Sequence, residues 1–430
     1  MQYEIKAPSV LQHTAKLPAS KSISNRVLVI HALTGGHTRP SNLSDCDDTE
    51  VIVEALNNNP YEINIKAAGT AMRFMTAYLA VKEGDEHVLT GTERMRHRPI
   101  AILVDALRKL GAQIDYVGEE GYPPLRIKGC APEGGLLEVA GNISSQFISA
   151  LLMIGPQLKN GLTLHMTGEV ISRPYIDLTL WTMREFGADA DWSDFDTITV
   201  KPQPYKDRAY LTENDWSAAS YWYEMMALTS NLDDEIKLEG LMDGSKQGDS
   251  QVRYIFSLLG VKTIFASKTP GEPTTVTLKH SGHCVPRLEY NFVNSPDLAQ
   301  TFVVCCALLN VPFHFTGLST LKIKETDRIE AMKKEMRKLG YVVRSANDCE
   351  LIWDGELCEP SLEAGIDTYE DHRMALAFAP AALRFEGLRI NNPQVVTKSY
   401  PYFWEDIKAA GFEVKSEEFA TASEELGISN

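Results

Sequence analysis

The chain has 430 residues, of which 44% are apolar and 23% are charged. This composition is typical of a folded globular protein, and it excludes a disordered tail protein and a collagen-like fibre. The formal net charge of −16 excludes non-specific attraction to nucleic acid or anionic lipid, so locally placed lysines and arginines must hold any anionic ligand. At about 150 residues per domain, the length predicts two or three domains.

No segment of the chain predicts insertion into a membrane. The longest uncharged run, residues 298–321, is interrupted by Gln300, Asn310 and Pro312, and we expect its centre to be a buried helix. Residues 1–11 lack the apolar stretch of a secretory signal, and seven cysteines without a CxxC pair fit a reducing compartment. We therefore expect a cytoplasmic protein without nucleic-acid or membrane partners.

One group of possible metal ligands consists of His280, His283 and Cys284. It lacks a fourth ligand at a recognisable spacing, so we do not expect a zinc site there. Nothing else in the sequence requires a metal or an organic cofactor.

Amphipathic helices that end at a glycine recur along the chain at intervals of roughly 75 residues. Each of these helices runs directly into a strand-like segment. Glycine adopts the left-handed conformation after a helix at no steric cost, which explains its recurrence at this point. The glycines are Gly111, Gly187, Gly260, Gly340 and Gly411.

A second class of helix is apolar on nearly all sides and is therefore expected to be buried on all sides. The repeated unit reads as buried helix, strand, outer helix and a further strand or hairpin. Six such units fit the chain and predict two lobes of three units each. The buried helices are expected to begin near Ser22, Thr70, Ser145, Asp215, Asp297 and Asp371.

The first unit is shortened. Only a short segment separates Glu50 from Ala67, and Asn57 and Asn58 occupy the place where the helix-ending glycine is expected. We therefore expect a truncated unit at the edge of its lobe.

The two lobes are not separated by a Pro/Ser-rich linker. We expect direct crossovers near Pro18 and Glu213. These crossovers would place residues 1–18 and 214–430 in lobe one, and residues 19–213 in lobe two.

Basic residues stand in the first turn of several buried helices. A serine, threonine or aspartate at such a position is ordinarily a structural cap. A cation there opposes the helix dipole unless an anion lies between it and the exposed amides. Lys21, Arg26 and Arg373 therefore predict phosphate binding at these helix ends.

Two loops add further charged residues. Taken alone, the charges of each loop could belong to a solvated surface helix. The HRP (97–99) and SRP (172–174) segments are ordinary helix starts with proline in the first turn. The occurrence of these charges at matching points of the repeats instead predicts one shared site. The charged loop residues are Arg94, Arg96, Arg98, Lys324, Glu325 and Arg328.

Seven segments together resemble the 5-enolpyruvylshikimate-3-phosphate synthase family, and the resemblance runs nearly from end to end. The segments are LPASKSISNR (17–26), AGTAMR (68–73), SSQFISALLM (144–153), SRPYIDLTL (172–180), KETDR (324–328), EDHRMALAFA (370–379) and TKSYPYFWEDI (397–407). The family transfers the enolpyruvyl group of phosphoenolpyruvate to the 5-hydroxyl of shikimate 3-phosphate, on the shikimate pathway to chorismate and aromatic amino acids. It is also the target of glyphosate.

The resemblance implies an α/β fold of the enolpyruvyl transferase type. This fold is a two-lobed inverse α/β barrel, with three βαβαββ units per lobe and the active site in a cleft that closes between the lobes. The resemblance also implies a monomer that uses no cofactor and whose partners are two small-molecule substrates.

The resemblance further implies roles by position. Asp297 is the implied catalytic base, and Glu325 and Lys21 are the two candidates to deliver a proton to C3 of phosphoenolpyruvate. The residues implied to bind shikimate 3-phosphate are Lys21, Ser22, Arg26, Ser144, Ser145, Gln146, Ser172, Tyr175, Asp297 and Lys324. Those implied to bind phosphoenolpyruvate are Lys21, Gly69, Arg94, Gln146, Arg328, Arg373 and Lys398.

Gly69 leaves two explanations open, a backbone turn with positive φ or the close approach of a ligand. Three other positions depart from the family pattern. Ala67 and Thr320 stand where asparagine is usual, and Arg173 replaces a usual lysine. We therefore expect one polar contact to be missing beside phosphoenolpyruvate, next to Ala67.

Two alternative functions remain. The enolpyruvyl transferase that acts on UDP-N-acetylglucosamine has the same fold and donor, but its early Lys-Asn pair and reactive loop cysteine are replaced here by Lys21-Ser22 and an Arg94 loop without cysteine. A non-catalytic repeat scaffold would explain the helices but not the cations at their N-termini. Phosphate release from phosphoenolpyruvate with either acceptor distinguishes the three functions.

Overall fold

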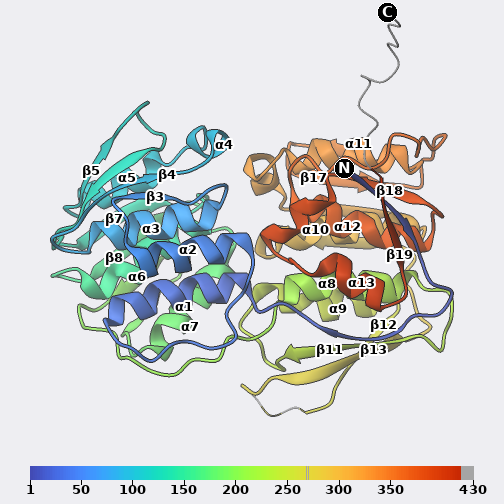
Figure 1. Cartoon of the computed structure of the whole chain (residues 1–430), viewed down its shortest axis with the longest axis horizontal. Helices are drawn as coiled ribbons and strands as arrows, with labels where there is room; N and C mark the ends of the chain where they lie inside the picture. The colour runs from blue at the N-terminus through green and yellow to red at the C-terminus, as the bar shows by residue number, and fades with distance from the viewer. Residues whose placement is uncertain (268, 270, 418–430) are drawn as a thin grey trace, which may run out of the picture.

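The structure is a computed structural model that describes residues 1–267, 269 and 271–417. Its elements gather in two lobes that lie side by side, each with its own hydrophobic core (Figure 1). The core of lobe two is built from residues between Ile23 and Tyr210. The core of lobe one combines residues 5–17 with residues between Trp216 and Phe412.

Lobe two contains the first seven helices and eight strands. Its helices are α1 (Lys21–Thr34), α2 (Asp47–Asn58), α3 (Gly69–Ala80), α4 (Glu93–Arg96), α5 (Ala101–Lys109), α6 (Ser145–Ile154) and α7 (Arg173–Glu185), with the 3-10 turn η1 (Gly155–Gln157). Its strands are β3 (Glu62–Asn64), β4 (Glu86–Thr90), β5 (Gln113–Tyr116), β6 (Leu125–Lys128), β7 (Gly135–Ala140), β8 (Leu162–Thr167), β9 (Ala190–Asp194) and β10 (Thr197–Val200).

Lobe one contains the remaining elements. Its helices are α8 (Trp216–Leu228), α9 (Val252–Leu258), α10 (Ala299–Leu308), α11 (Arg328–Lys338), α12 (His372–Phe378) and α13 (Phe403–Ala409). Its 3-10 turns are η2 (Gly248–Gln251), η3 (Phe292–Asn294), η4 (Pro296–Leu298), η5 (Ser319–Ile323), η6 (Ala379–Leu383) and η7 (Pro393–Lys398). Its strands are β1 (Gln2–Lys6), β2 (Gln12–Lys16), β11 (Glu235–Leu241), β12 (Val261–Phe265), β13 (Thr274–His280), β14 (Leu288–Asn291), β15 (Phe313–Thr316), β16 (Arg344–Ala346), β17 (Glu350–Trp353), β18 (Leu388–Asn391) and β19 (Glu413–Glu417).

Among the described residues, the strands form five sheets, and four of these sheets share one topology. In each of the four, the first two strands pair in parallel and the remaining neighbours pair antiparallel. The strand orders are β2-β11-β13-β12, β3-β4-β6-β5, β7-β8-β10-β9 and β14-β15-β17-β16. This repetition agrees with the repeating α/β units expected from the sequence.

The fifth sheet is completed by the start of the chain. Strand β1 lies between β18 and β19 and pairs antiparallel with both. A parallel bridge between Ile366 and Ile390 adds a fourth, single-residue position at the edge of this sheet. Strands β1 and β2 therefore join sheets whose other strands all follow residue 234.

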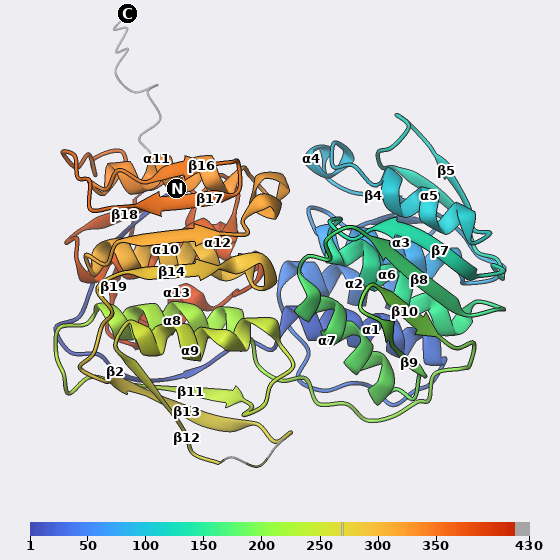
Figure 2. The same ribbon diagram turned by 180° about the vertical axis from the view of Figure 1, so that it is seen from behind.

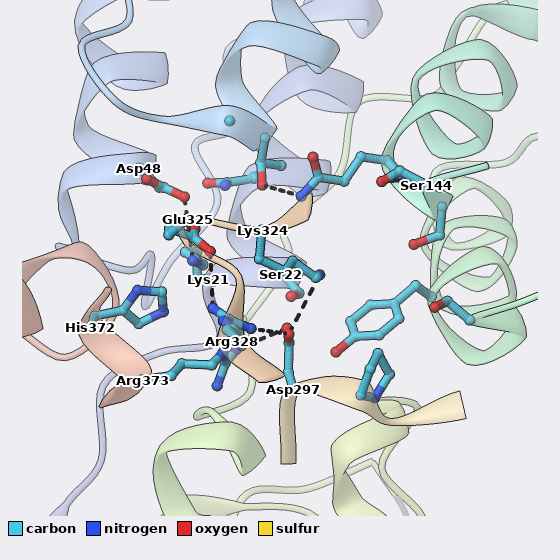
Figure 3. A pocket seen from close by; sticks show the side chains of 18 of the residues that line it. Lys21, Ser22, Asp48, Ser144, Asp297, Lys324, Glu325, Arg328, His372 and Arg373 are labelled. Carbon is cyan, nitrogen blue, oxygen red and sulfur yellow. Dashed lines mark hydrogen bonds and ion pairs between the residues drawn. The ribbon is translucent and has the colours of Figure 1, made fainter. Parts of the chain in front are cut away.

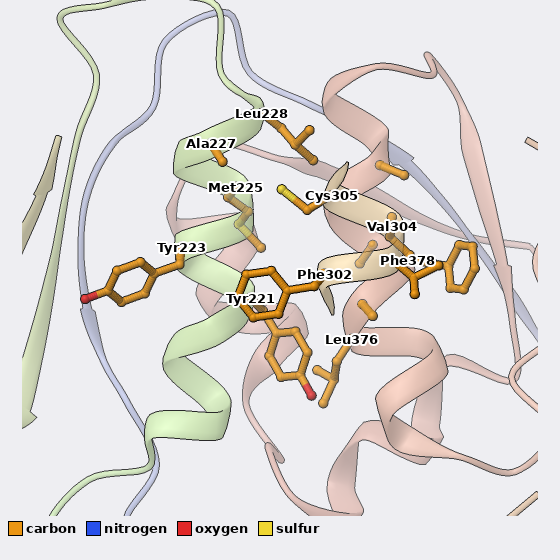
Figure 4. Close-up of a cluster of buried hydrophobic side chains, with 14 of the residues drawn as sticks. Tyr221, Tyr223, Met225, Ala227, Leu228, Phe302, Val304, Cys305, Leu376 and Phe378 are labelled. Carbon is orange, nitrogen blue, oxygen red and sulfur yellow. The ribbon is translucent and has the colours of Figure 1, made fainter. Parts of the chain in front are cut away.

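The helices that are apolar on nearly all sides lie inside each lobe and the sheets lie outside them, as expected for an inverse α/β barrel. Side chains of α8, α10 and α12, including Met225, Phe302 and Leu376, meet in the core of lobe one (Figure 4). The sheet of β11, β12 and β13 lies outside α8 and α9 (Figure 2). These helices are apolar but short, and no helix in the described ranges has both the length and the apolarity needed to cross a bilayer.

The predicted starts of the buried helices agree closely with the observed ones, with one exception. Asp215 and Asp371 are the N-caps of α8 and α12, and each carboxylate accepts a backbone N–H of the first turn. Asp297 instead lies within η4, ahead of α10, whose own N-cap makes no side-chain hydrogen bond. Both carboxylate oxygens of Asp297 are therefore available for other partners.

The five glycines predicted to end the outer helices all adopt positive φ, between 84° and 105°. In the first unit the helix continues through Asn57 and Asn58, and the left-handed residue is Asn59, with φ of 43°. Asparagine tolerates this conformation because its short polar side chain can bond locally. In the described part of the chain, α1 and α2 have no four-stranded sheet of their own, as expected for a truncated unit.

Candidate active site

A polar cavity lies between the lobes (Figure 3). Lobe two contributes the starts of α1, α3, α6 and α7, and lobe one contributes η4, the segment before α11, and the start of α12. The lining residues are Lys21, Ser22, Asn25, Arg26, Asp48, Gly69, Thr70, Arg98, Ser144, Ser145, Gln146, Ser172, Tyr175, Pro296, Asp297, Lys324, Glu325, Arg328, His372 and Arg373. Helix ends from distant parts of the chain therefore meet at one site.

The structure brings most of the candidate residues together in this cavity, including every residue expected to bind shikimate 3-phosphate. Arg94 and Lys398, both expected on the phosphoenolpyruvate side, instead line a neighbouring cavity that shares Arg98 and Glu325 with the first. The guanidinium of Arg94 pairs with the exposed carboxylate of Glu370 across the lobes. From the same loop, it is Arg98 that reaches the main cavity.

Asp297 lies at the centre of a cluster of cations (Figure 3). One of its carboxylate oxygens accepts from Arg328 at 3.0 Å, and the other accepts from Arg373 at 3.0 Å. The ammonium of Lys324 lies 3.5 Å from the first oxygen. Burial alone would raise the pKa of Asp297, but Arg373, Lys324 and Arg328 together hold it well below the usual range.

Glu325 is held in the same way. Its carboxylate accepts from Arg328 at 2.9 Å and from Lys398 at 3.0 Å. Burial opposes ionisation, but Lys398 and Arg328 outweigh it, so the pKa of Glu325 is well below its usual range. Arg328 in turn donates to Asp371 at 2.7 Å, which makes it the common partner of three carboxylates. In this arrangement Glu325 carries no proton.

Arg26 is a buried cation with neutral partners. Its guanidinium donates to the Thr179 hydroxyl at 2.7 Å, to the Ser149 hydroxyl at 3.1 Å, and to the carbonyls of Ser22 and Tyr175. Because no carboxylate offsets its burial, the pKa of Arg26 is lowered to about 10. The positive charge of Arg26 is therefore available to an anionic ligand.

Lys21 differs from Arg26 because a carboxylate partly balances its charge. Its ammonium donates to the carboxylate of Asp48 at 3.3 Å, and its backbone N–H donates to Asp215. Burial alone would lower the pKa of Lys21, but the carboxylate of Asp48 outweighs burial and raises it. Lys21 therefore carries a proton and a positive charge.

The structure separates the two explanations for Gly69. Gly69 is not among the glycines with positive φ, so its backbone does not require glycine. A Cβ there would instead lie 2.7 Å from a guanidinium nitrogen of Arg98 and 2.8 Å from one of Arg73. The Arg73 guanidinium also donates to the Gly69 carbonyl at 2.9 Å. The absence of a side chain therefore lets two cations approach this helix start.

Several lining residues had no assigned role in the sequence. Asp48 stands in the first turn of α2, where an acidic residue is an ordinary helix feature, so its pairing with Lys21 gave no signal. His372 is buried, and its pKa is held well below the usual range by burial and by neighbouring cations, first among them Lys21. Only its place beside Arg373 at a buried helix start pointed to the site.

The three positions that depart from the family pattern are not among the residues that line the main cavity. Ala67 lines the neighbouring cavity, and Thr320 lines a further cavity that shares Ser144, Ser145 and Ser172 with the main one. The Arg173 guanidinium stacks 3.7 Å from the ring centroid of Trp192 and donates to a backbone carbonyl, away from the main cavity. The replacement of lysine by Arg173 therefore leaves the cavity lining unchanged.

The structure does not gather His280, His283 and Cys284 into one group of possible metal ligands. The ring of His280 is hydrogen-bonded to the hydroxyl of Thr229 at 2.7 Å. Across the described residues, no three histidine, cysteine or acidic side chains are arranged to hold a metal ion.

Comparisons with known proteins agree on one family. The model of the family described as EPSP synthase (3-phosphoshikimate 1-carboxyvinyltransferase) matches residues 56–407. A 3-phosphoshikimate 1-carboxyvinyltransferase from Bacteroides fragilis is 57% identical over 415 residues, which cover 96% of this chain and 99% of that protein. The enzyme of the same name from Vibrio cholerae is 34% identical, with 90% and 94% of the two chains covered.

A solved structure shows the same fold. The EPSP synthase from Acinetobacter baumannii superposes with a TM-score of 0.77 at 21% sequence identity. The match covers 96% of this chain and 100% of that one. The two proteins therefore share one fold over nearly all of this chain.

Proposed function

The chain belongs to the EPSP synthase family and transfers the enolpyruvyl group of phosphoenolpyruvate to the 5-hydroxyl of shikimate 3-phosphate, and we propose that the cavity between its lobes carries out this reaction. The observation that carries this assignment is the arrangement of Asp297 and Glu325 among cations contributed by both lobes. Two anionic substrates must approach each other there, and cations from both lobes offset their repulsion.

The phosphate of shikimate 3-phosphate binds at the lobe-two end. Arg26 offers an uncompensated charge, and the hydroxyls of Ser144, Ser145 and Ser172 line the same wall. Ser144 caps α6, so the exposed amides of that helix also face an anion. Lys324 reaches the same cavity from the other lobe, which supports its proposed contact with this substrate.

Phosphoenolpyruvate binds among Lys21, Arg328 and Arg373, which line the same cavity as Gly69. Arg98 takes the place expected for Arg94, because Arg98 lines the main cavity and lies against Gly69. Lys398 acts through Glu325, to which it donates at 3.0 Å. The shared wall between the two cavities brings Lys398 within reach of the same ligand.

Asp297 acts as the base once substrates occupy its cations. In the arrangement described, three cations hold Asp297 ionised and make it a weak base. The anionic groups of the substrates compete for Arg328, Arg373 and Lys324, and this competition raises the basicity of Asp297 as the 5-hydroxyl arrives. The 5-hydroxyl then loses its proton as its oxygen adds to C2 of phosphoenolpyruvate.

We assign to Glu325 the delivery of a proton to C3 of phosphoenolpyruvate. Lys21 is protonated, but a raised pKa makes it a weak acid. Glu325 is ionised through Lys398 and Arg328, and an anionic ligand on these two cations raises its pKa and lets it take up a proton. The adduct then loses phosphate as the Glu325 carboxylate, which has given up its proton, takes a proton back from C3, and the nearby cations stabilise the leaving group.

Both lobes are needed for this chemistry, and we propose that they are residues 19–213 and residues 1–18 with 214–430. Contacts such as the one from the Thr397 hydroxyl to Asp47 at 2.8 Å join the lobes at the neighbouring cavity and support closure over the substrates. Closure excludes water, which would otherwise hydrolyse the activated intermediate. We further propose that the protein acts as a cytoplasmic monomer.

Phosphate release tests the proposed site. The wild-type protein with phosphoenolpyruvate and shikimate 3-phosphate is expected to release phosphate, whereas UDP-N-acetylglucosamine as acceptor is expected to give none. Glu325→Gln should reduce the rate by about 10² or more, since it removes the proton donor. Release with the UDP sugar, or full activity of Glu325→Gln, would contradict the assignment.

A further inference from the structure

The start of α7 and the turn η2 meet across the two lobes, at one wall of the active-site cavity. A Cβ on Gly248 of η2 would lie 2.7 Å from the Cβ of Pro174 in α7, so glycine permits the close approach. The next residue on each side forms a polar contact. The hydroxyl of Tyr175 donates to a carboxylate oxygen of Asp249 at 3.4 Å.

Tyr175 lines the cavity, whereas Asp249 is not among the lining residues. Asp249 is 3% exposed, and its second oxygen accepts a short hydrogen bond from the hydroxyl of Ser217 in α8. Lobe one therefore fixes the carboxylate on one side and presents it to a lobe-two side chain on the other.

We propose that Asp249 is a positioning residue for shikimate 3-phosphate, which orients the Tyr175 hydroxyl at the cavity wall only when the lobes are together. The inference rests on the proposed role of Tyr175 in binding that substrate. Tyr175 also accepts from Arg26 through its backbone carbonyl, at 3.3 Å. The Asp249 contact therefore bears on the same wall that holds the substrate phosphate, and it couples closure to binding.

The contact depends on the charge of Asp249. The charged groups around it are Asp297, Asp215 and Arg373, and Tyr175 and Ser217 are its hydrogen-bond partners. Burial and the charge of Asp297 raise the pKa of Asp249 to about 6, against the opposing effect of Arg373. Above this pH the carboxylate is ionised and accepts a charge-assisted hydrogen bond from Tyr175. Below it, the hydrogen bond is neutral and weaker.

Steady-state kinetics with Asp249→Asn test the proposal. The side chain keeps its shape but loses its charge, so the KM for shikimate 3-phosphate should rise about ten-fold at pH 7.5, as expected for loss of a charge-assisted hydrogen bond. The kcat should stay within about two-fold, because Asp249 does not touch the reacting atoms. Asp233→Asn, at an exposed position of lobe one, is the matched control and should change neither constant.

A double-variant cycle and a pH series separate positioning from a general loss of structure. Tyr175→Phe should raise the same KM, and adding Asp249→Asn to it should raise KM no further, because both remove one interaction. The ratio of the KM of Asp249→Asn to that of the wild type should fall towards one below pH 6. Taking this ratio cancels the titration of the substrate phosphate.

An additive double variant, or a KM ratio that stays constant between pH 5 and 8, would overturn the proposal. A normal KM in Asp249→Asn beside a raised KM in Tyr175→Phe would overturn the positioning role alone. A normal KM in Tyr175→Phe would overturn it together with the proposed role of Tyr175. Absence of phosphate release by the wild type would instead contradict the proposed function of the cavity.

Discussion

Two arginines that line the cavity, one from each lobe, are both buried, but they lie in opposite electrostatic surroundings. Arg26, in lobe two, donates only to hydroxyls and carbonyls, and burial lowers its pKa to about 10. Arg328, in lobe one, donates to Asp297, Glu325 and Asp371, which raise its pKa. One end of the site holds uncompensated charge, and the other holds charge that is already balanced.

This difference assigns different tasks to the two ends. A buried guanidinium without an anionic partner is stabilised when a phosphate arrives, so the Arg26 end is suited to binding. At the Arg328 end, an arriving anion competes with Asp297 and Glu325 for the cation. This competition raises the pKa of the two carboxylates. The Arg328 end is therefore suited to acid–base chemistry that begins only when substrate is present.

The largest expected effect comes from the balanced end. Asp297→Asn keeps the shape and hydrogen-bonding reach of the side chain but removes its basicity, so turnover should fall by about 10² or more. Calorimetric affinity for shikimate 3-phosphate should change by less than about three-fold, because the proposed phosphate site is formed by Arg26 and not by Asp297. Near-normal turnover would remove Asp297 from the mechanism.

A variant at the uncompensated end should give the reverse pattern. Arg26→Gln removes the proposed charge-assisted contact to the substrate phosphate, which is worth about 2 kcal/mol, so calorimetry should show affinity for shikimate 3-phosphate about 30-fold weaker. Arg26→Lys keeps the charge without the planar guanidinium, and it should restore part of the affinity. If Arg26→Gln lowered kcat and left affinity intact, the two ends would not have separate tasks.

Gly69→Ala tests the proposed phosphoenolpyruvate site. The new methyl group would lie under 3 Å from guanidinium nitrogens of Arg73 and Arg98, so both cations must shift. The KM for phosphoenolpyruvate should rise by about ten-fold, and glyphosate inhibition should weaken, with the KM for shikimate 3-phosphate nearly unchanged. Equal changes in all three constants with a lower Tm would mean that Gly69 serves the backbone.

The smallest expected effect concerns a buried carboxyl group that lies outside the site. Glu224 is fully buried in α8, its carboxylate makes no hydrogen bond with the described residues, and burial raises its pKa well above the usual range. A raised pKa in the folded state stabilises the protein below the unfolded pKa, near 4.3, and this contribution is lost as the pH rises. Without a ligand to offset the charge, the protein keeps Glu224 neutral.

Glu224→Gln removes this dependence on pH. Its Tm should match that of the wild type near pH 4 and exceed it at pH 8, by a few degrees for a gain of about 1 kcal/mol. Glu119→Gln, on an exposed loop, is the matched control and should show no such difference. A pH-independent gap between Glu224→Gln and the wild type would show that Glu224 is not neutral in the folded state.

Local chemistry made much of the fold predictable. A glycine after each outer helix and apolarity around each inner helix are properties of a few neighbouring residues, and both gave correct elements. The closing of the last sheet by β1 could not be read in the same way, because it joins Tyr3 to Ile390, far apart in the chain. Asp297 was placed correctly near a helix start, but the η4 turn that frees its carboxylate had no signature.

The candidate site was predictable in its residue types more than in their geometry. Basic residues at helix starts pointed to Lys21, Arg26 and Arg373 because a cation there requires an explanation. Arg98 lines the main cavity and Arg94 does not, and this difference depends on how one loop is placed against the other lobe, which no local pattern encodes. Partners such as Asp48 were missed because an acidic residue in a first helical turn is ordinary.

A crystal structure with bound shikimate 3-phosphate tests most directly whether the two ends have separate tasks. We expect the substrate phosphate within hydrogen-bonding distance of Arg26 and the hydroxyls of Ser144, Ser145 and Ser172. The 5-hydroxyl should face Asp297, with Arg328 still bonded to Asp371. A phosphate bound instead to Arg328 and Arg373, with Arg26 left in contact only with its neutral partners, would contradict the account.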